Sequence, residues 1–266
     1  MSEFTVLETP EDVAEAGAKA IAQALQEGSR TLVLAGGTTP ARCYELLAEF
    51  EVEWGRVTVL FGDERCVPPD HPDSNYRMAR ATLLDKVAPA TVHRMPAELG
   101  PDEGAAEYSS TIKALVPLDV VVLGIGEDGH TASLFPGHPV LEAKGLVAGV
   151  RNSPKPPPER VTLTLPVLQG ARQVIILATG VGKAKAVALA KRHEVPSGMI
   201  AGARWLIDRA AAGGEQGRGR SLDPVRRHHA SGRAGEGGGA RGRRPHPGGR
   251  DGRPFRAQPH VRPARR

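Results

Sequence analysis

The chain has 266 residues, 40% of them hydrophobic and 24% charged, so it is long enough to bury a core without disulfide or metal support. Its two cysteines, Cys43 and Cys66, have no second pair, which excludes a zinc framework or a disulfide scaffold and favours a reducing compartment. No apolar stretch approaches the roughly 20 residues of a membrane helix, and the N-terminus lacks a signal-peptide pattern. We therefore expect a cytoplasmic protein.

The formal net charge of +5 is unevenly distributed. Residues 213–266 contain 14 Arg, no Lys and four acidic residues, so they carry +10 and leave −5 on residues 1–212. This tail is rich in Gly, Arg and Pro and poor in large apolar side chains, which predicts disorder. It is interpreted as a basic arm, a passive extension or an out-of-frame translation of GC-rich coding sequence. We expect one domain over residues 1–212, with nucleic-acid contact limited to weak, non-specific binding through the tail.

Short β-branched apolar runs alternate with helical periodicity along residues 1–212. The apolar runs predict strands at residues 31–35, 57–61, 119–123, 161–165 and 174–178. The periodic stretches predict helices at residues 11–27, 41–50, 76–87, 103–115, 183–193 and 203–212. This alternation predicts an α/β sandwich around a mostly parallel sheet.

The first motif is the strand-to-helix passage LVLAGGTTPARCYELL at residues 32–47. Glycines at Gly36 and Gly37 allow the backbone to approach an anion, Thr38 and Thr39 add hydroxyl donors, and Pro40 opens a helix whose N-terminus favours negative charge. The motif matches neither the GxxxxGK[ST] loop nor GxGxxG. It indicates a phosphate site or, as the alternative, a tight turn with a capping threonine.

The second motif, VLFGDERCVPPDHPDSNYRMA, begins at Val59. Asp63, Glu64 and Arg65 follow an apolar strand, at the edge where open α/β sheets bind their ligands. Three consecutive charges at this place indicate a functional edge. The alternative is a salt-bridged loop.

The third motif, LDVVVLGIGEDGHTASLFPG, places His130 in a glycine-rich loop directly after an apolar strand. A histidine titrates near neutrality, so it takes a proton from water and returns it later. Asp128 lies two residues earlier, where it is expected to orient the imidazole. The other histidines that we considered, His71, His93, His138 and His193, lack this setting and are expected to be structural.

Two cationic residues complete the candidate site. Arg160 opens the segment RVTLTLP, and Lys183 lies in ATGVGKAKAV. Both are predicted near strand or helix ends, where a cation forms charge-assisted hydrogen bonds to phosphate. For Lys183 the alternative is a lysine on a helix surface.

The five motifs together resemble the 6-phosphogluconolactonase family. GGTTP, FGDERCVP with DSNY, GIGEDGHTASLFPG, RVTLTLP and TGVGKAKAV have the order and spacing of that family over about residues 5–212, and WLIDRAAA looks like its closing helix. The resemblance implies a Rossmann-like three-layer α/β/α sandwich. It also implies hydrolysis of 6-phosphogluconolactone to 6-phosphogluconate in the oxidative pentose phosphate pathway, without metal or cofactor.

Two other functions remain to be separated from the lactonase. Glucosamine-6-phosphate deaminases have a similar fold, and their loop resembles DGHIAFNEP, with a glutamate five residues after the histidine; here that position is Phe135. Ring opening in an amino sugar then lacks a proton carrier, which favours the lactonase. A sugar-phosphate-sensing domain would need a helix-turn-helix, and no such pattern precedes Leu32.

We predict that His130 is the general base, that Asp128 holds its imidazole, and that Asp63 is a second polar partner. The substrate phosphate is expected to bind at the glycine turn (Gly36, Gly37, Thr38, Thr39) with Arg160 and Lys183. Arg65 is expected to contact either the phosphate or the developing oxyanion. We further expect a monomer whose partner is a small sugar phosphate.

Overall fold

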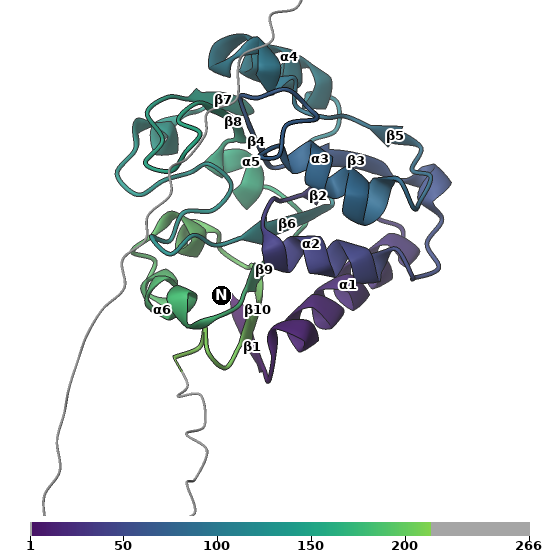
Figure 1. Ribbon diagram of the computed structural model, residues 1–266, viewed down its shortest axis with the longest axis vertical. Coiled ribbons are helices and arrows are strands. Elements are labelled where there is room, and N and C mark those ends of the chain that lie inside the picture. The colour runs from purple at the N-terminus through teal and green to yellow at the C-terminus, as the bar shows by residue number, and fades with distance from the viewer. Residues whose placement is uncertain (1, 214–266) are drawn as a thin grey trace, which may run out of the picture. The chain divides into compact units, whose positions relative to one another are not determined.

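The computed structural model describes residues 2–213 (Figure 1). Except for Gly213, the predicted tail lies outside the described residues, so its disorder and the domain boundary at residue 212 stay predictions. Within residues 2–213, no helix is long and apolar enough to cross a membrane.

The central sheet has seven strands in the order β1-β10-β9-β6-β2-β3-β5, and every neighbouring pair is parallel. Its members are β1 (Glu3–Leu7), β2 (Thr31–Leu34), β3 (Thr58–Phe61), β5 (Thr91–Val92), β6 (Val120–Gly124), β9 (Gln173–Ala178) and β10 (Arg204–Asp208). All four residues of β2 are buried, which explains why this strand is apolar without alternation. The predicted α/β fold with a mostly parallel sheet is confirmed.

Helices flank this sheet. They are α1 (Pro10–Gln26), α2 (Thr38–Leu47), α3 (Asn75–Ala79) with a π-helical continuation η2 (Arg80–Leu84), α4 (Pro101–Ile112), α5 (Leu165–Gln169) and α6 (Ala184–Lys191). In α1 the Thr9 side chain accepts from the Asp12 amide while Asp12 accepts from the Thr9 amide, a capping box that sets the start of the helix. Helices α1 and α2 pack together in front of β6, β9 and β10 (Figure 1).

A second sheet departs from the prediction of parallel strands. Strands β4 (Asp63–Arg65), β8 (Arg160–Leu163) and β7 (Val147–Val150) pair antiparallel in the order β4-β8-β7. Residues 161–165 therefore do not belong to the parallel sheet, although their β-branched composition resembles that of its strands. Burial selects the apolar composition in both sheets, whereas the pairing direction depends on the partner strand.

The predicted helix at residues 203–212, including the closing helix implied by WLIDRAAA, is wrong. Residues Arg204–Asp208 form β10, which lies between β1 and β9, and Trp205, Leu206 and Ile207 are fully buried there. The three alanines at 210–212 favour a helix locally, but the preceding apolar run gains more by completing the sheet. The partner strand β1, at the N-terminus, was also missed.

The topology brings the predicted motifs to one edge. The next strand of this sheet after β2 in the chain is β3, which lies on one side of β2. On its other side β2 pairs with β6, and the next strand of the sheet after β6 is β9, which lies farther in that second direction. The strand order thus reverses between β2 and β6, the place where open α/β sheets form a ligand crevice beyond their carboxyl ends. The loops that follow β2, β3, β6 and β9 meet at this crevice.

Candidate active site

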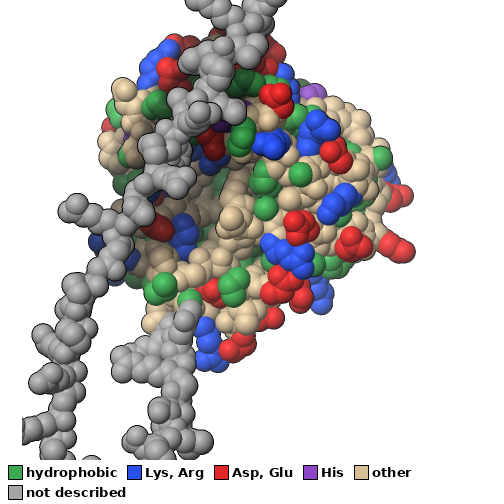
Figure 2. Space-filling model, viewed as in Figure 1, with side chains coloured by type: hydrophobic (Ala, Val, Ile, Leu, Met, Phe, Trp, Pro, Cys, Tyr) green, Lys and Arg blue, Asp and Glu red, His purple; other side chains and the backbone are tan. Residues whose placement is uncertain are grey.

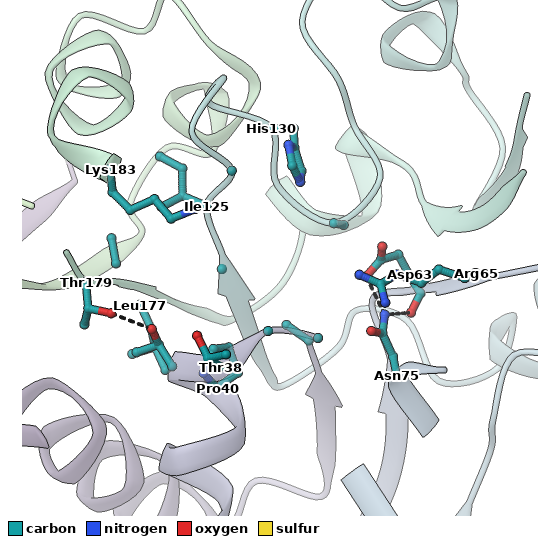
Figure 3. A pocket seen from close by; sticks show the side chains of 18 of the residues that line it. Thr38, Pro40, Asp63, Arg65, Asn75, Ile125, His130, Leu177, Thr179 and Lys183 are labelled. Carbon is teal, nitrogen blue, oxygen red and sulfur yellow. Dashed lines mark hydrogen bonds between the residues drawn. The ribbon is translucent and has the colours of Figure 1, made fainter. Parts of the chain in front are cut away.

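A cavity of about 220 Å³ lies at this crevice (Figure 3). It is smaller than the roughly 300–1,000 Å³ of drug-sized ligand sites, so it suits a compact substrate. The space-filling view shows a hollow on this face with a Lys or Arg side chain inside it (Figure 2). Nine of the ten predicted site residues line the cavity: Gly36, Gly37, Thr38, Thr39, Asp63, Arg65, His130, Arg160 and Lys183.

The glycine turn (residues 36–39) connects β2 to α2 at the floor of the cavity. Gly37 is the N-cap residue of α2 and has a φ of 112°, a backbone conformation that favours glycine. Within residues 2–213 no side chain caps this helix, so its first amides remain available to a bound anion. The Thr39 hydroxyl lies 2.7 Å from the Thr179 hydroxyl after β9, which ties the turn to the neighbouring loop.

The histidine loop (residues 125–130) follows β6. The amide of Gly126 donates to the carbonyl of His130 at 2.8 Å, which closes the loop on itself. A side chain at Gly126 would overlap the His130 ring, so glycine is required here for steric reasons. Asp128 Oδ1 accepts from the His130 amide at 3.2 Å and lies 2.5 Å from His130 Nδ1. Asp128, the tenth predicted residue, thus contacts the imidazole instead of lining the cavity.

This pair leaves the imidazole ready to accept a proton. Burial lowers the pKa of His130, and this effect outweighs the neighbouring Asp128 carboxylate, which raises it. Burial by itself would raise the pKa of Asp128, but the charge and hydrogen bonds of His130 lower it overall. With Nδ1–H donated to Asp128, the His130 Nε2 is the basic nitrogen, and no described residue hydrogen-bonds to it.

Phe135 forms an apolar wall behind the histidine. Its ring is fully buried, with its centroid 4.6 Å from that of the His130 ring, and the Arg160 guanidinium carbon lies 5.5 Å from the Phe135 centroid. The position that holds the glutamate in the deaminase pattern is therefore occupied by an aromatic side chain that carries no proton.

Asp63 is the centre of a buried polar network. The Ser133 hydroxyl donates to its Oδ2 at 2.7 Å, and the Asn75 amide nitrogen lies 3.2 Å from its Oδ1. Ser133 belongs to the segment after the histidine loop and Asn75 opens α3, so Asp63 joins three separate parts of the chain. Its negative charge also acts on His130, whose pKa it raises.

Glu64 lies behind the cavity and supports it. Its buried carboxylate accepts from the backbone amides of Arg65, Asn75 and Tyr76 and from the Ser74 hydroxyl. Burial raises the pKa of Glu64 even though these backbone donors lower it. Glu64, the middle residue of the motif Asp63-Glu64-Arg65, therefore fixes the start of α3 and does not line the cavity.

The cationic residues reach the cavity from different elements. Arg160, at the start of β8, is buried. Its Nε donates to the Pro157 carbonyl, and its Nη2 donates to the carbonyls of Lys155 and Pro156. No described residue accepts from Nη1, which leaves this nitrogen for a ligand. Burial lowers the pKa of Arg160 and the Asp63 carboxylate raises it. Lys183 extends into the cavity from the start of α6, at the end away from Asp63 and Arg65 (Figure 3).

Sequence reasoning missed three polar residues at or beside the cavity: Asn75 and Thr179 line it, and Ser133 lies behind it and donates to Asp63. Asn75 and Ser133 stand inside motifs that were recognised, but neither carries a charge that marks it. Their position next to Asp63 depends on how β3, α3 and the histidine loop meet. Residues 2–213 contain no group of three or more His, Cys, Asp or Glu that could hold a metal ion.

The fold and the cavity define an α/β protein with an anion-suited turn opposite a histidine–aspartate pair. The chain belongs to the family of glucosamine-6-phosphate isomerases/6-phosphogluconolactonase, whose pattern matches residues 7–207. The resemblance predicted from the motifs is thereby confirmed.

Named relatives and solved structures agree with this placement. The chain is 41% identical over 214 residues to 6-phosphogluconolactonase of Streptomyces coelicolor, covering 70% of this chain and 82% of that protein. It is 38% identical over 236 residues to that of Rattus norvegicus, covering 79% and 92%. The solved 6-phosphogluconolactonase of Trypanosoma brucei superposes with a TM-score of 0.72 at 28% identity, over 80% of this chain and 98% of that one.

A solved monomeric glucosamine-6-phosphate deaminase superposes almost as well, with a TM-score of 0.69 at 20% identity. At that identity the similarity shows the fold alone. The fold therefore does not distinguish the two activities of the family, and the distinction depends on residues at the cavity and directly behind it, such as Phe135.

Proposed function

We propose that this chain hydrolyses 6-phospho-D-glucono-1,5-lactone to 6-phospho-D-gluconate, a step of the oxidative pentose phosphate pathway. The observation that carries this proposal is His130, hydrogen-bonded to Asp128, in the same small cavity as the glycine turn and Lys183. The lactonase relatives at about 40% identity support the same reaction.

In the proposed reaction, His130 Nε2 takes a proton from a water molecule while that water attacks the lactone carbonyl carbon C1. Asp128 accepts the Nδ1–H and stabilises the imidazolium that forms. The tetrahedral intermediate then collapses, and the bond between C1 and the ring oxygen breaks. Protonated His130 returns the proton to the departing ring oxygen, which yields the hydroxyl at C5 and a carboxylic acid at C1. The acid then releases its proton to solvent and leaves as the carboxylate.

The phosphate is proposed to bind at the end of the cavity formed by the glycine turn and Lys183. Backbone amides at the start of α2, the threonine hydroxyls and the ammonium group all favour an anion there. Arg160 is the second proposed phosphate cation: it pairs with Arg65 across β4 and β8, and we propose that its Nη1 reaches the phosphate across the cavity. Arg65 lies with Asp63 at the opposite end (Figure 3), which favours the carbonyl oxygen as its partner.

A parallel assay with 6-phosphogluconolactone and glucosamine-6-phosphate tests the proposal. We expect turnover of the lactone above its spontaneous hydrolysis and no ammonia release from the amino sugar, because Phe135 replaces the deaminase acid. Ammonia release would assign the chain to the isomerase branch of the family. Inactivity on both compounds together with measurable binding would favour a sugar-phosphate sensor.

We also propose that the protein is a cytoplasmic monomer. Cys43 and Cys66 are both free thiols, which fits a reducing compartment. Any contact with nucleic acid is assigned to the basic residues 213–266 alone. Light scattering coupled to size-exclusion chromatography tests the monomer, and retention on a polyanion column at rising salt tests the tail contact.

A further inference from the structure

The Asn75 side chain is nearly buried at the cavity wall, with one of its two polar atoms unused. It is 3% exposed, and it lines the cavity at the start of α3. Its amide nitrogen lies 2.9 Å from the Asp63 carbonyl oxygen and 3.2 Å from Asp63 Oδ1. Both of these partners are acceptors, so the nitrogen must face Asp63 and the carboxamide cannot turn over.

The carboxamide oxygen is consequently directed away from Asp63, as Figure 3 shows. No described residue donates a hydrogen bond to it. A side chain at Gly36 would overlap this oxygen, so Gly36 leaves the space that the carboxamide occupies beside the glycine turn. The oxygen is not among the buried side-chain atoms without a partner, so it still faces the cavity space, and a ligand that displaces solvent from it has to supply a donor in return.

We propose that Asn75 determines substrate specificity by accepting a hydrogen bond from the C2 or C3 hydroxyl of the lactone ring. This inference rests on the proposed function. Lys183 and Asn75 lie at opposite ends of the cavity (Figure 3), so a phosphate at the Lys183 end directs the ring atoms farthest from C6 toward Asn75. In a 1,5-lactone the farthest atom is C2, opposite C5, and C1 and C3 follow at equal distance. C1 is the carbonyl carbon, so the hydroxyls that can donate there are those at C2 and C3.

The same contacts explain why Asn75 is held so firmly. Glu64 accepts from the Asn75 backbone amide at 2.8 Å, and Ser74, the N-cap of α3, binds the same carboxylate. The backbone of Asn75 is therefore fixed by Glu64 and its side chain by Asp63. An acceptor fixed in this way rejects an analogue that lacks the hydroxyl, because the oxygen then loses solvent without gaining a donor.

The test compares kcat/KM for 6-phosphogluconolactone with kcat/KM for its 2-deoxy and 3-deoxy analogues. We expect the wild-type protein to lose about tenfold on one of the two, the factor expected for one neutral hydrogen bond. Asn75→Ala is expected to lower kcat/KM for the parent lactone about tenfold. Its kcat/KM for the discriminated deoxy analogue should equal that of the wild-type protein. Discrimination between the two substrates therefore disappears in this variant.

Ser133→Ala is the matched control, because it also removes one donor to Asp63 but Ser133 is fully buried and does not line the cavity. It is expected to keep the wild-type ratio between the parent and the deoxy analogue. Asn75→Ser is a second variant, which keeps a hydroxyl donor beside Asp63 for folding but shortens the side chain. It is expected to lose the discrimination as Asn75→Ala does.

Wild-type discrimination retained in either folded Asn75 variant would overturn the proposal and leave Asn75 as a support for Asp63. A wild-type protein that hydrolyses both analogues as well as the parent would overturn it too. A wild-type protein with no lactonase activity is a different result, since it rejects the proposed function itself.

Discussion

The glycine turn and the histidine loop approach one cavity from different strands, but they present different kinds of groups to it (Figure 3). The turn offers backbone amides and the hydroxyls of Thr38 and Thr39, all from residues adjacent in the chain. At the other side, His130 acts with Asp128, while the nearby Asp63 depends on Ser133 and Asn75, which are 70 and 12 residues away from it.

This difference predicts how each side responds to substitution. Backbone donors survive most side-chain changes, so the phosphate end should lose affinity gradually as single cations are removed. The acid–base end depends on single side-chain atoms whose pKa values are set by burial and by one another. Loss of one such side-chain atom at the acid–base end should lower kcat. Four experiments distinguish this effect on kcat from the effect on substrate binding at the phosphate end.

The largest effect is expected for His130→Ala. Removal of the general base should lower kcat by about a hundredfold to ten-thousandfold, after subtraction of spontaneous lactone hydrolysis. The matched control is His71→Ala, since His71 is half-buried and lies outside the cavity. A His130 variant with nearly wild-type kcat would remove this residue from the mechanism.

Asp128→Asn should lower kcat by about tenfold to a hundredfold, the value of a hydrogen bond to a charged group. The pH profile gives a second readout. Burial lowers the pKa of His130, so the acid limb of kcat/KM should lie below the ordinary histidine value of about 6.5. Asp128 raises the pKa of His130, so its neutralisation should move that limb to still lower pH. A shift to higher pH would contradict the assigned contact.

Lys183→Ala should mainly raise KM, by about tenfold, with little change in kcat. A phosphate contact remote from C1 binds the ground state and the transition state alike, so its loss weakens binding without slowing the chemical step. The control substrate is non-phosphorylated gluconolactone, for which wild type and variant should be equally poor. If wild type hydrolysed that compound as efficiently as the phosphorylated one, the phosphate end would be wrongly assigned.

The smallest effect is expected for truncation after Ala212, which should leave kcat/KM unchanged. Every residue assigned to either end of the cavity lies at or before Lys183. The truncated chain carries a net charge of −5, so it should also lose any salt-sensitive binding to polyanions. A folded truncated protein without lactonase activity would show that residues 213–266 contribute to the site.

Most of the candidate site was predictable because its residues follow strands directly. Gly36 after β2, Asp63 after β3 and His130 after β6 each stand in a strand-to-loop motif that is visible in the chain, and parallel strands bring such ends together. Asn75 was not predictable in the same way, because its role depends on which atoms of Asp63 and Gly36 it meets.

The sequence by itself determined the alternating α/β order, the glycine turn, the histidine loop and the apolar residue at Phe135, since these depend on neighbours in the chain. Only the tertiary structure decided that residues 204–208 are a strand, that β8 pairs antiparallel, and that the Asn75 oxygen is left for a ligand. The physical reason is that strand partners and side-chain hydrogen bonds join residues far apart in the chain. Local propensity is too weak to specify either of them.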